Sequence, residues 1–511
     1  MSDYLNKTVT LTSELFKMKT NRVISVFFAA CLFLSEPSAR GQQASLDTLL
    51  NHIRDLSSSV YGGRMSGTEG YMSAADYAIE ALERYGVKPY NGEWAQYFET
   101  ESNIIENCTF NTYVNAADNR DVYVLGRDFC CVGMSGRGYA DAPVVFCGYG
   151  IDNGSFNEYA DVDARGKVVM VLSGVPDFLP RSVTSKYEQI RDKARTAKRH
   201  GACAMVVINM SSNCSPYEVQ GTVYNGELPH EATFPVIQPT RDCGDRLLAG
   251  ELLTLEEAVQ GINNEHKPMS FHLRKKFEIE VNAKYHPSAL TANVVGIYPG
   301  VDPKMVNEYV VVGASLDHVG MQGTTCLFPG ADDNASGVAA LLEVARMLSM
   351  SEDQPSRSIV FVLFAGGEQM WLGSRIFVSN FTPLKRIEAF VDVSKIGSGD
   401  SIAVLGNKRY PHLWSVARRV DTLYCGNDMV VGMKTQPKWN AVAFSHVGIP
   451  SINITGYKGN RHPHVPSDIV ENIDRRFVVK ATQLLFETVL DLSFGDYQGR
   501  SNDSKRVRFE K

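Results

Sequence analysis

The feature that most constrains the fold is a regular alternation of short apolar segments and helical segments from His286 onward. Apolar segments such as "EYVVVGASL" and "SIVFVLFAGG" are separated by stretches with helical spacing, such as "SGVAALLEVARMLSM". This alternation predicts an α/β fold, in which a mixed but mostly parallel sheet is flanked by helices on both faces. In such folds, ligands bind beyond the carboxyl ends of the strands.

The chain is long enough for more than one domain. At about 150 residues per domain, its 511 residues suggest two to three. We predict an N-terminal helical part at 44–123, a β-rich domain at 124–285, the α/β domain at 286–494 and a polar tail at 495–511. The composition, 44% hydrophobic and 21% charged, is ordinary for a soluble protein. The net charge of −6 and the lack of a basic patch argue against a nucleic-acid partner.

Residues 1–43 have the pattern of a leader with a secretory signal peptide. Lys17, Lys19 and Arg22 precede the apolar run "VISVFFAACLFL", which is followed by a polar segment. The run is too short for a membrane span, and no other segment is long and apolar enough for one. Met18 is an alternative start. We therefore expect export to the periplasm or the medium, with simple cleavage preferred to lipid attachment at Cys31.

The ten cysteines show no C-x-x-C spacing. Nine of them lie outside the leader, and an odd number without pattern favours buried free thiols over a framework of disulfides.

Acidic and histidine residues recur where the predicted strands of the α/β domain end. Because these strand ends meet at one edge of the sheet, the residues predict a metal site, with zinc as the preferred ion. Each has a structural alternative, and Asp333 alone would serve equally well as a helix cap. The residues are Asp317, His318, Asp332, Asp333, Glu368, Asp392, His462, His464 and Asp468.

Several motifs resemble the zinc aminopeptidase and glutamate carboxypeptidase family, metallopeptidase family 28. They are "EYVVVGASLDHVG", "PGADDNASGVAALLEVAR", "FVLFAGGEQMWLGSRIFV" and "HPHVPSD", in the order and spacing of the family. The stretch "APVVFCGYGI…YADVDARGKVVMVLSG" resembles the protease-associated (PA) domain often inserted in it. The resemblance implies two zinc ions that share one carboxylate. It also implies an aminopeptidase activity on peptide or aminoacyl substrates.

Only some of the family's metal-ligand positions are occupied by ligand residues in this chain. Asp333 matches the shared carboxylate, and Glu368 and His464 match the other two ligands of one zinc. At the second zinc, Ser315 and Ser394 stand where the family has histidine and aspartate.

The general base of the family is also replaced. Gly367 occupies the position of the base, and Asp317, which would orient the missing histidine, remains without its partner. The two unshared ligands of one zinc are replaced, and all three ligands of the other zinc are kept. We therefore expect one zinc ion and not two.

Two functional interpretations remain open from the sequence. The first is a degenerate peptidase, a possible pseudoenzyme, with weak or absent activity. The second is an active single-zinc hydrolase, or an acyl-transfer enzyme similar to glutaminyl cyclases, that uses another base.

The residues that would substitute in the second interpretation are of two kinds. Asp317, His318 and Asp332 are the candidate bases, and Asp317 and Asp392 are candidate ligands for the second site. A shifted alignment, with Glu368 as base and Gln369 as ligand, is a further alternative.

Overall fold

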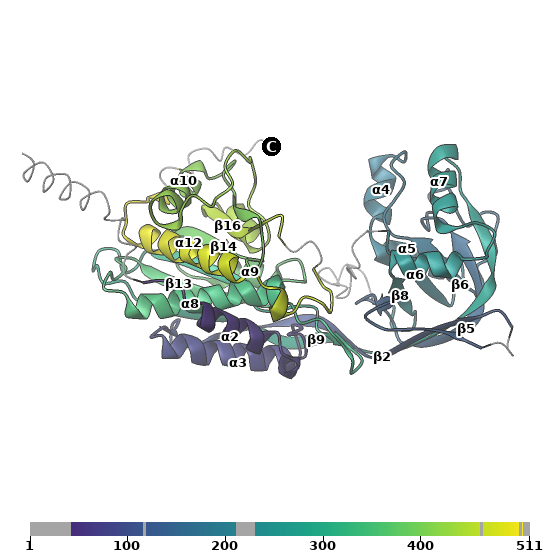
Figure 1. Ribbon diagram of the computed structural model, residues 1–511, viewed down its shortest axis with the longest axis horizontal. Coiled ribbons are helices and arrows are strands. Elements are labelled where there is room, and N and C mark those ends of the chain that lie inside the picture. Colours follow the sequence, from purple (N-terminus) through teal and green to yellow (C-terminus); the bar gives the residue numbers. More distant parts are fainter. Residues whose placement is uncertain (1–41, 116–118, 211–229, 460–462, 500–502, 504–511) are drawn as a thin grey trace, which may run out of the picture.

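The computed structural model describes residues 42–115, 119–210, 230–459, 463–499 and 503. Two lobes lie at opposite ends of a long antiparallel pair formed by β2 (Ala95–Tyr113) and β9 (Ser270–Tyr298) (Figure 1). Both lobes belong to one hydrogen-bonded sheet, because β9 pairs with β13 in the larger lobe and with β5 in the smaller one.

The larger lobe contains the predicted mixed α/β sheet. Its strand order is β15-β16-β14-β10-β13-β9, and neighbours from β16 to β13 are parallel while the strands at both sides are antiparallel. The bounds are β10 (Tyr309–Ser315), β13 (Ser358–Phe364), β14 (Ile387–Val393), β15 (Ser401–Leu405) and β16 (Ser451–Tyr457).

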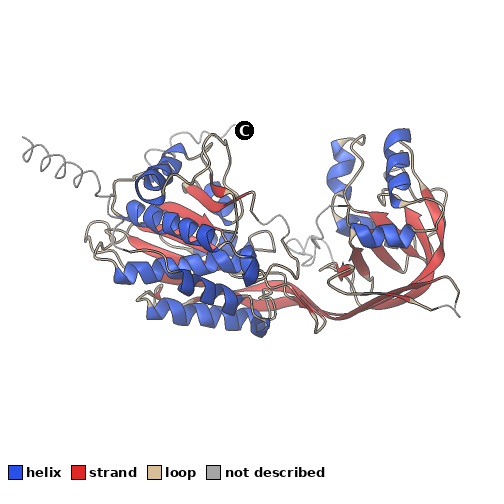
Figure 2. Cartoon of the chain, in the orientation of Figure 1, coloured by secondary structure: helices blue, strands red, loops and turns tan. Residues whose placement is uncertain are grey.

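Helices cover both faces of this sheet, as Figure 2 shows. In β10, Val310 and Val312 pack into the cluster on one face, and Val311 packs into the cluster on the other. All three are fully buried, which explains why apolar residues follow one another in this strand without polar residues between them. One face carries α2 (Leu46–Leu56), α3 (Glu69–Arg84), α8 (Ser336–Met350), α10 (Pro411–Val420) and α12 (Arg475–Ser493), and the other carries α9 (Leu372–Asn380) and α11 (Asn440–His446).

The smaller lobe contains the other part of the sheet and has its own core. Its strands follow the order β9-β5-β6-β7-β8-β4, with parallel pairing from β5 to β8. The bounds are β4 (Phe129–Cys131), β5 (Gly138–Cys147), β6 (Val168–Leu172), β7 (Ala204–Ile208), β8 (Val236–Pro239), α4 (Arg181–Tyr187), α5 (Ile190–Arg199), α6 (Arg241–Leu248) and α7 (Leu255–Glu265).

The prediction of a helical part through residue 123 is wrong beyond α3. The chain there forms β1 (Lys88–Pro89), β2 and β3 (Asp121–Tyr123). Register shifts at Thr100/Ser102 and Ile105/Asn107 interrupt the alternation of buried and exposed residues in β2, so the strand lacks a regular period of two. Its partner β9 also lies far away in the sequence, which local patterns do not reveal.

The remaining elements are short and lie in connections. They are η1 (Ser59–Tyr61), β11 (Met321–Gln322), β12 (Cys326–Leu327), the irregular turn η2 (Ala331–Ala335), η3 (Leu384–Arg386), η4 (Asp421–Cys425) and η5 (Val470–Asn472). Among the described residues, every cysteine is a free thiol and most of them are buried, as expected. No helix in the described ranges is both long and apolar enough to cross a membrane. The predicted leader, with Met18 and Cys31, lies almost wholly outside the described residues.

Candidate metal centre

The sheet topology brings four predicted site residues together at the carboxyl ends of the parallel strands. His318 follows β10, Asp333 lies in η2 ahead of α8, and Glu368 follows β13. His464 comes from the loop between β16 and η5. One ligand atom from each of the four residues lies within 4.8 Å of the others, so the group has the dimensions of a metal site.

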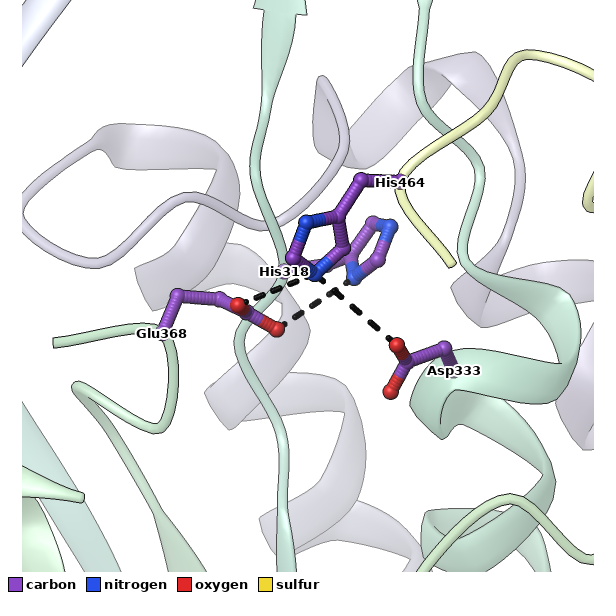
Figure 3. A group of neighbouring side chains, drawn as sticks. All are labelled: His318, Asp333, Glu368 and His464. Carbon is purple, nitrogen blue, oxygen red and sulfur yellow. Dashed lines mark ion pairs between the residues drawn. The ribbon is translucent and has the colours of Figure 1, made fainter. Parts of the chain in front are cut away.

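Glu368 and His464 form the closest contact in the group. Nε2 of His464 lies 3.0 Å from Oε2 of Glu368 and 3.9 Å from Oδ2 of Asp333 (Figure 3). Burial acts to lower the pKa of His464, but the two carboxylates outweigh it and raise this pKa above its usual value. Burial likewise acts to raise the pKa of Glu368, and His464 reverses the shift, so this carboxyl group has a lowered pKa.

His318 is a fully buried imidazole at the back of the site. Its Nδ1 lies 3.8 Å from Oε1 of Glu368, and its ring meets the ring of His464 edge-on at 5.2 Å. Neither ring nitrogen has a hydrogen-bond partner among the described residues. Burial lowers the pKa of His318 to about 3, so the ring is neutral and can offer a lone pair. A metal ion would satisfy this unpaired nitrogen.

Asp333 makes a second contact, which the sequence pattern does not predict. Oδ2 of Asp333 lies 2.9 Å from Nζ of Lys395, in the stretch "VDVSKIG". Burial alone would raise the pKa of Asp333, but Lys395 and the two imidazoles lower it to about 2. The carboxylate therefore stays ionised and available to a cation. Asp333 is not a helix cap, because the cap residue of α8 is Ala335 and its side chain makes no cap hydrogen bond.

The three replaced positions line the same pocket but offer no second ligand set. Oγ of Ser315 accepts a hydrogen bond from Nδ2 of Asn440 at 3.0 Å. A Cβ atom on Gly367 would come within 2.5 Å of Oγ of Ser315 and 2.9 Å of Oδ1 of Asp317. The pocket has a volume of about 260 Å³ and is lined by Ser315, Asp317, Asp333, Asn334, Gly367, Glu368, Met370, Trp371, Ser394, Lys395, Trp439, Asn440, Pro463 and His464.

Asp317 keeps a structural partner in place of the missing histidine. Its Oδ1 accepts a hydrogen bond from the backbone N–H of Gly367 at 2.9 Å, and Oδ2 accepts one from Oγ of Ser66 at 3.1 Å. Its carboxylate thus holds the turn that carries Glu368. Burial, followed by the charge of Glu368, raises the pKa of Asp317 to about 7.

The other candidate carboxylates are engaged elsewhere. Asp332 accepts hydrogen bonds from the N–H of Gly397 at 2.6 Å and Oγ of Ser398 at 2.7 Å. Asp392 accepts from Nδ2 of Asn440 at 3.1 Å and Nδ2 of Asn453 at 2.8 Å. Neither lines the pocket.

Two further sequence candidates lie close to the site without joining it. Asp468 accepts hydrogen bonds from the N–H groups of Asp332 and Asp333 at 2.8 and 3.1 Å, so it positions η2. Gln369 hydrogen-bonds to Thr100 and to the carbonyl of Glu101. It is therefore directed toward β2 and is not placed as a ligand, which contradicts the shifted alignment. His462 lies outside the described residues.

The donor set fits zinc. The site offers two carboxylates and two imidazoles, which bind metal ions in their neutral form. Zinc takes such ligands in proteins, usually with four-coordinate geometry. The unpaired nitrogens of His318 are the observation that supports a resident cation, because unpaired buried polar atoms are rare. Zinc held by three of these residues would have a position open to act as a Lewis acid on a carbonyl group, whereas zinc held by all four would not.

Comparison with known proteins agrees with the fold and the domain content. Residues 293–489 match the model of peptidase family M28, and residues 140–247 match the PA domain. An aminopeptidase of Pseudomonas aeruginosa is 26% identical over 374 residues, which cover 70% of this chain and 58% of that protein. Leucine aminopeptidase 1 of Grosmannia clavigera is 24% identical over 213 residues, covering 38% and 52%. The chain thus spans little more than half the length of these relatives.

Solved structures share the fold over most of the chain. A zinc aminopeptidase from Bacillus subtilis has a TM-score of 0.60 at 18% identity, with 88% of this chain and 95% of that chain covered. An aminopeptidase from an Aneurinibacillus strain has a TM-score of 0.59 at 18% identity, with 88% and 93% covered. With both domain models matched in the expected order on this fold, the chain carries a peptidase family M28 domain at residues 293–489 and a PA domain at residues 140–247.

Proposed function

We propose that this protein is an M28 peptidase-type protein that binds a single zinc ion and has weak or no aminopeptidase activity. Asp333, Glu368 and His464 would hold the ion, as the sequence suggests, and His318 would be its fourth ligand. The proposal includes a peptide or aminoacyl ligand and export of the mature chain, which rests on the leader pattern alone.

One observation carries the proposal: four ligand atoms converge within 4.8 Å at one position, while the second position offers only Ser315 and Ser394. Zinc with four protein ligands is typical of structural sites, and catalytic sites keep one position open for water. A site closed by His318 agrees with the loss of the base at Gly367.

The chain's own residues define what remains of the catalytic machinery. Loss of a general base costs on the order of 10²- to 10⁴-fold in rate. Trp371 and Trp439 still line the pocket and offer apolar surface to a ligand side chain. The residues therefore support binding of a peptide-like ligand better than its hydrolysis.

A specific observation favours the second candidate function, an active single-zinc hydrolase or acyl-transfer enzyme. Oδ1 of Asp317 lies 2.9 Å from where the Cβ of a side chain at position 367 would be. Asp317 is therefore the candidate base closest to the position of the lost one. We rank this function second because the two carboxylate oxygens of Asp317 already accept hydrogen bonds from Gly367 and Ser66. Asp317 is also only 1% exposed.

Metal analysis and turnover together separate the two functions. We expect one equivalent of zinc in the purified protein and no turnover across a panel of aminoacyl and N-terminal glutaminyl substrates. The Asp333→Asn variant should lose the zinc, whereas Asp400→Asn, at an exposed pair with Lys458, should keep it. Two equivalents of zinc would refute the single-ion proposal. One equivalent with turnover that Asp317→Asn abolishes would establish the second function instead.

A further inference from the structure

Lys395 places a positive charge inside the candidate site. Its Nζ lies 2.9 Å from Oδ2 of Asp333, the oxygen that also faces Nε2 of His464 at 3.9 Å. The lysine side chain is 27% exposed, and its other charged neighbours are the carboxylates of Glu368 and Asp332. The ammonium therefore lies where a cation shared with Asp333 would lie.

The backbone holds Lys395 in this position. The residue is the second one after β14 and has a left-handed φ of 55°. Its N–H donates to Oδ1 of Asn334 at 3.0 Å, and its carbonyl accepts from the N–H of Gly456 at 2.9 Å. Because a left-handed conformation disfavours residues other than glycine, these contacts are needed to keep it.

Asn334 ties this conformation to the site itself. Its Nδ2 donates to the carbonyl of Ser315 at 3.1 Å and to that of Val393 at 3.3 Å. The residue next to Asp333 thus joins the ends of β10 and β14, where the replaced positions lie: Ser315 is the last residue of β10 and Ser394 directly follows β14. The contacts of Asn334 therefore hold both the backbone of Lys395 and the strand ends at the replaced positions Ser315 and Ser394.

We propose that the Lys395 ammonium is a resident cation that takes the place of a second metal ion beside Asp333. This inference rests on the proposed single-zinc function and gives it a further reason. Ser315 and Ser394 leave the second position without ligands, and the ammonium leaves it with a charge that repels a divalent ion. It also competes with the single zinc for Asp333.

The alternative is an ordinary ion pair at the edge of a pocket. Such pairs contribute little, with a median of about 0–1 kcal/mol, and their removal does not alter a metal site. A resident cation gives a different result. At an effective dielectric constant of about 20, a unit charge about 5 Å from a divalent ion changes its affinity by well over tenfold.

The test is the zinc affinity of Lys395→Met, measured by competition with a chromophoric chelator. We expect binding at least about tenfold tighter than in the wild type, with the stoichiometry still one. Lys395→Arg keeps the charge and should bind zinc within about threefold of the wild type. Lys458→Met removes a lysine from an exposed ion pair with Asp400 and should leave the affinity unchanged. Unchanged or weaker binding in Lys395→Met overturns the proposal.

A second readout covers the case in which Lys395→Met folds poorly. Lys395→Gln also removes the charge and keeps a polar side chain. In the presence of chelator, we expect the melting temperature of Lys395→Gln to be lower than that of the wild type. On addition of zinc, we expect the melting temperature of the variant to increase by more than that of the wild type. An equal rise in both proteins overturns the inference. If the wild type itself binds two zinc ions, both the proposed function and this inference fail. If it binds one zinc ion and Lys395→Met does not bind it more tightly, the inference alone fails.

Discussion

Replacement of His318 by alanine tests whether the fourth imidazole is a zinc ligand. In the metal-free protein, both ring nitrogens are buried without a partner among the described residues, and each such group costs about 1–3 kcal/mol. The substitution removes this cost. It also leaves a cavity, and a large-to-alanine change in a core costs about 2–5 kcal/mol. These effects oppose each other, so we expect the free energy of unfolding without zinc to change by at most about 2 kcal/mol.

The zinc-bound state should respond much more strongly. A structural zinc site with four protein ligands is worth about 10–16 kcal/mol, or roughly 3 kcal/mol per ligand. A loss of about 3 kcal/mol corresponds to roughly 10²-fold in affinity. We therefore expect His318→Ala to bind zinc about 100-fold more weakly, as measured by chelator competition, while the metal-free protein unfolds at a similar urea concentration.

His52→Ala is a matched control. His52 lies in α2 and is also buried, but its Nδ1 lies 2.7 Å from the hydroxyl of Tyr77, and its ring packs edge-on against Tyr77 and Tyr85. This variant should lose stability equally with and without zinc and keep the wild-type zinc affinity. The ligand role of His318 is refuted if His318→Ala behaves in the same way. Cobalt in place of zinc provides a spectroscopic check, because an opened coordination position in His318→Ala would admit azide and change the visible spectrum.

Three further predictions concern the frame around the site. Burial lowers the pKa of His52 to about 4, below its unfolded value of 6.5, so the unfolded state takes up the proton first as the pH falls, and stability is lost between these two values. In His52→Gln, the decrease in the free energy of unfolding from pH 7 to pH 4, measured by urea unfolding, should be smaller by on the order of 2–3 kcal/mol. An unaltered pH dependence would show that His52 does not cause this decrease. Gly367→Glu should lower the free energy of unfolding by about 1–3 kcal/mol without restoring turnover, because its Cβ would come within 2.5 Å of Oγ of Ser315. Arg64 is fully buried and donates hydrogen bonds to the carbonyls of Leu316 and Gly330 at 3.0 and 3.1 Å. Arg64→Met should lower the free energy of unfolding by about 3 kcal/mol or more and weaken zinc binding, because both loops lose this contact. Normal zinc affinity in a folded Arg64→Met variant would contradict this prediction.

The residues around the metal position were predictable because they follow the ends of parallel strands. Asp333, Glu368 and His464 come from three separate segments, yet strand order alone places such segments at one edge of the sheet. From the sequence, His318 was a strand-end candidate and a possible substitute base, and no ligand position was assigned to it. Its position depends on the path of the chain after β10, where the N–H of His318 donates to the carbonyl of Arg64 in a distant segment.

Lys395 could not be predicted from local pattern. A lysine after a strand is normally directed to solvent, and here a left-handed φ and the contact with Asn334 turn it toward Asp333. The long strand β2 was missed for a similar reason. Its pairing with β9 runs from Ala95 with Val294 to Tyr113 with Lys276, a separation that no short window includes.

The charges of the site explain why these replacements occur together. By the resemblance, the family site has carboxylates at four positions, Asp333, Glu368, and those now occupied by Gly367 and Ser394, against two divalent ions, a sum of zero. This chain keeps two carboxylates and adds one ammonium, so the site carries −1 without zinc and +1 with one ion. A second divalent ion would bring the sum to +3 in a largely buried pocket, where uncompensated charge is strongly unfavourable. In the proposed site, the absence of two acids and the presence of Lys395 therefore oppose binding of a second metal ion by charge as well as by ligand number.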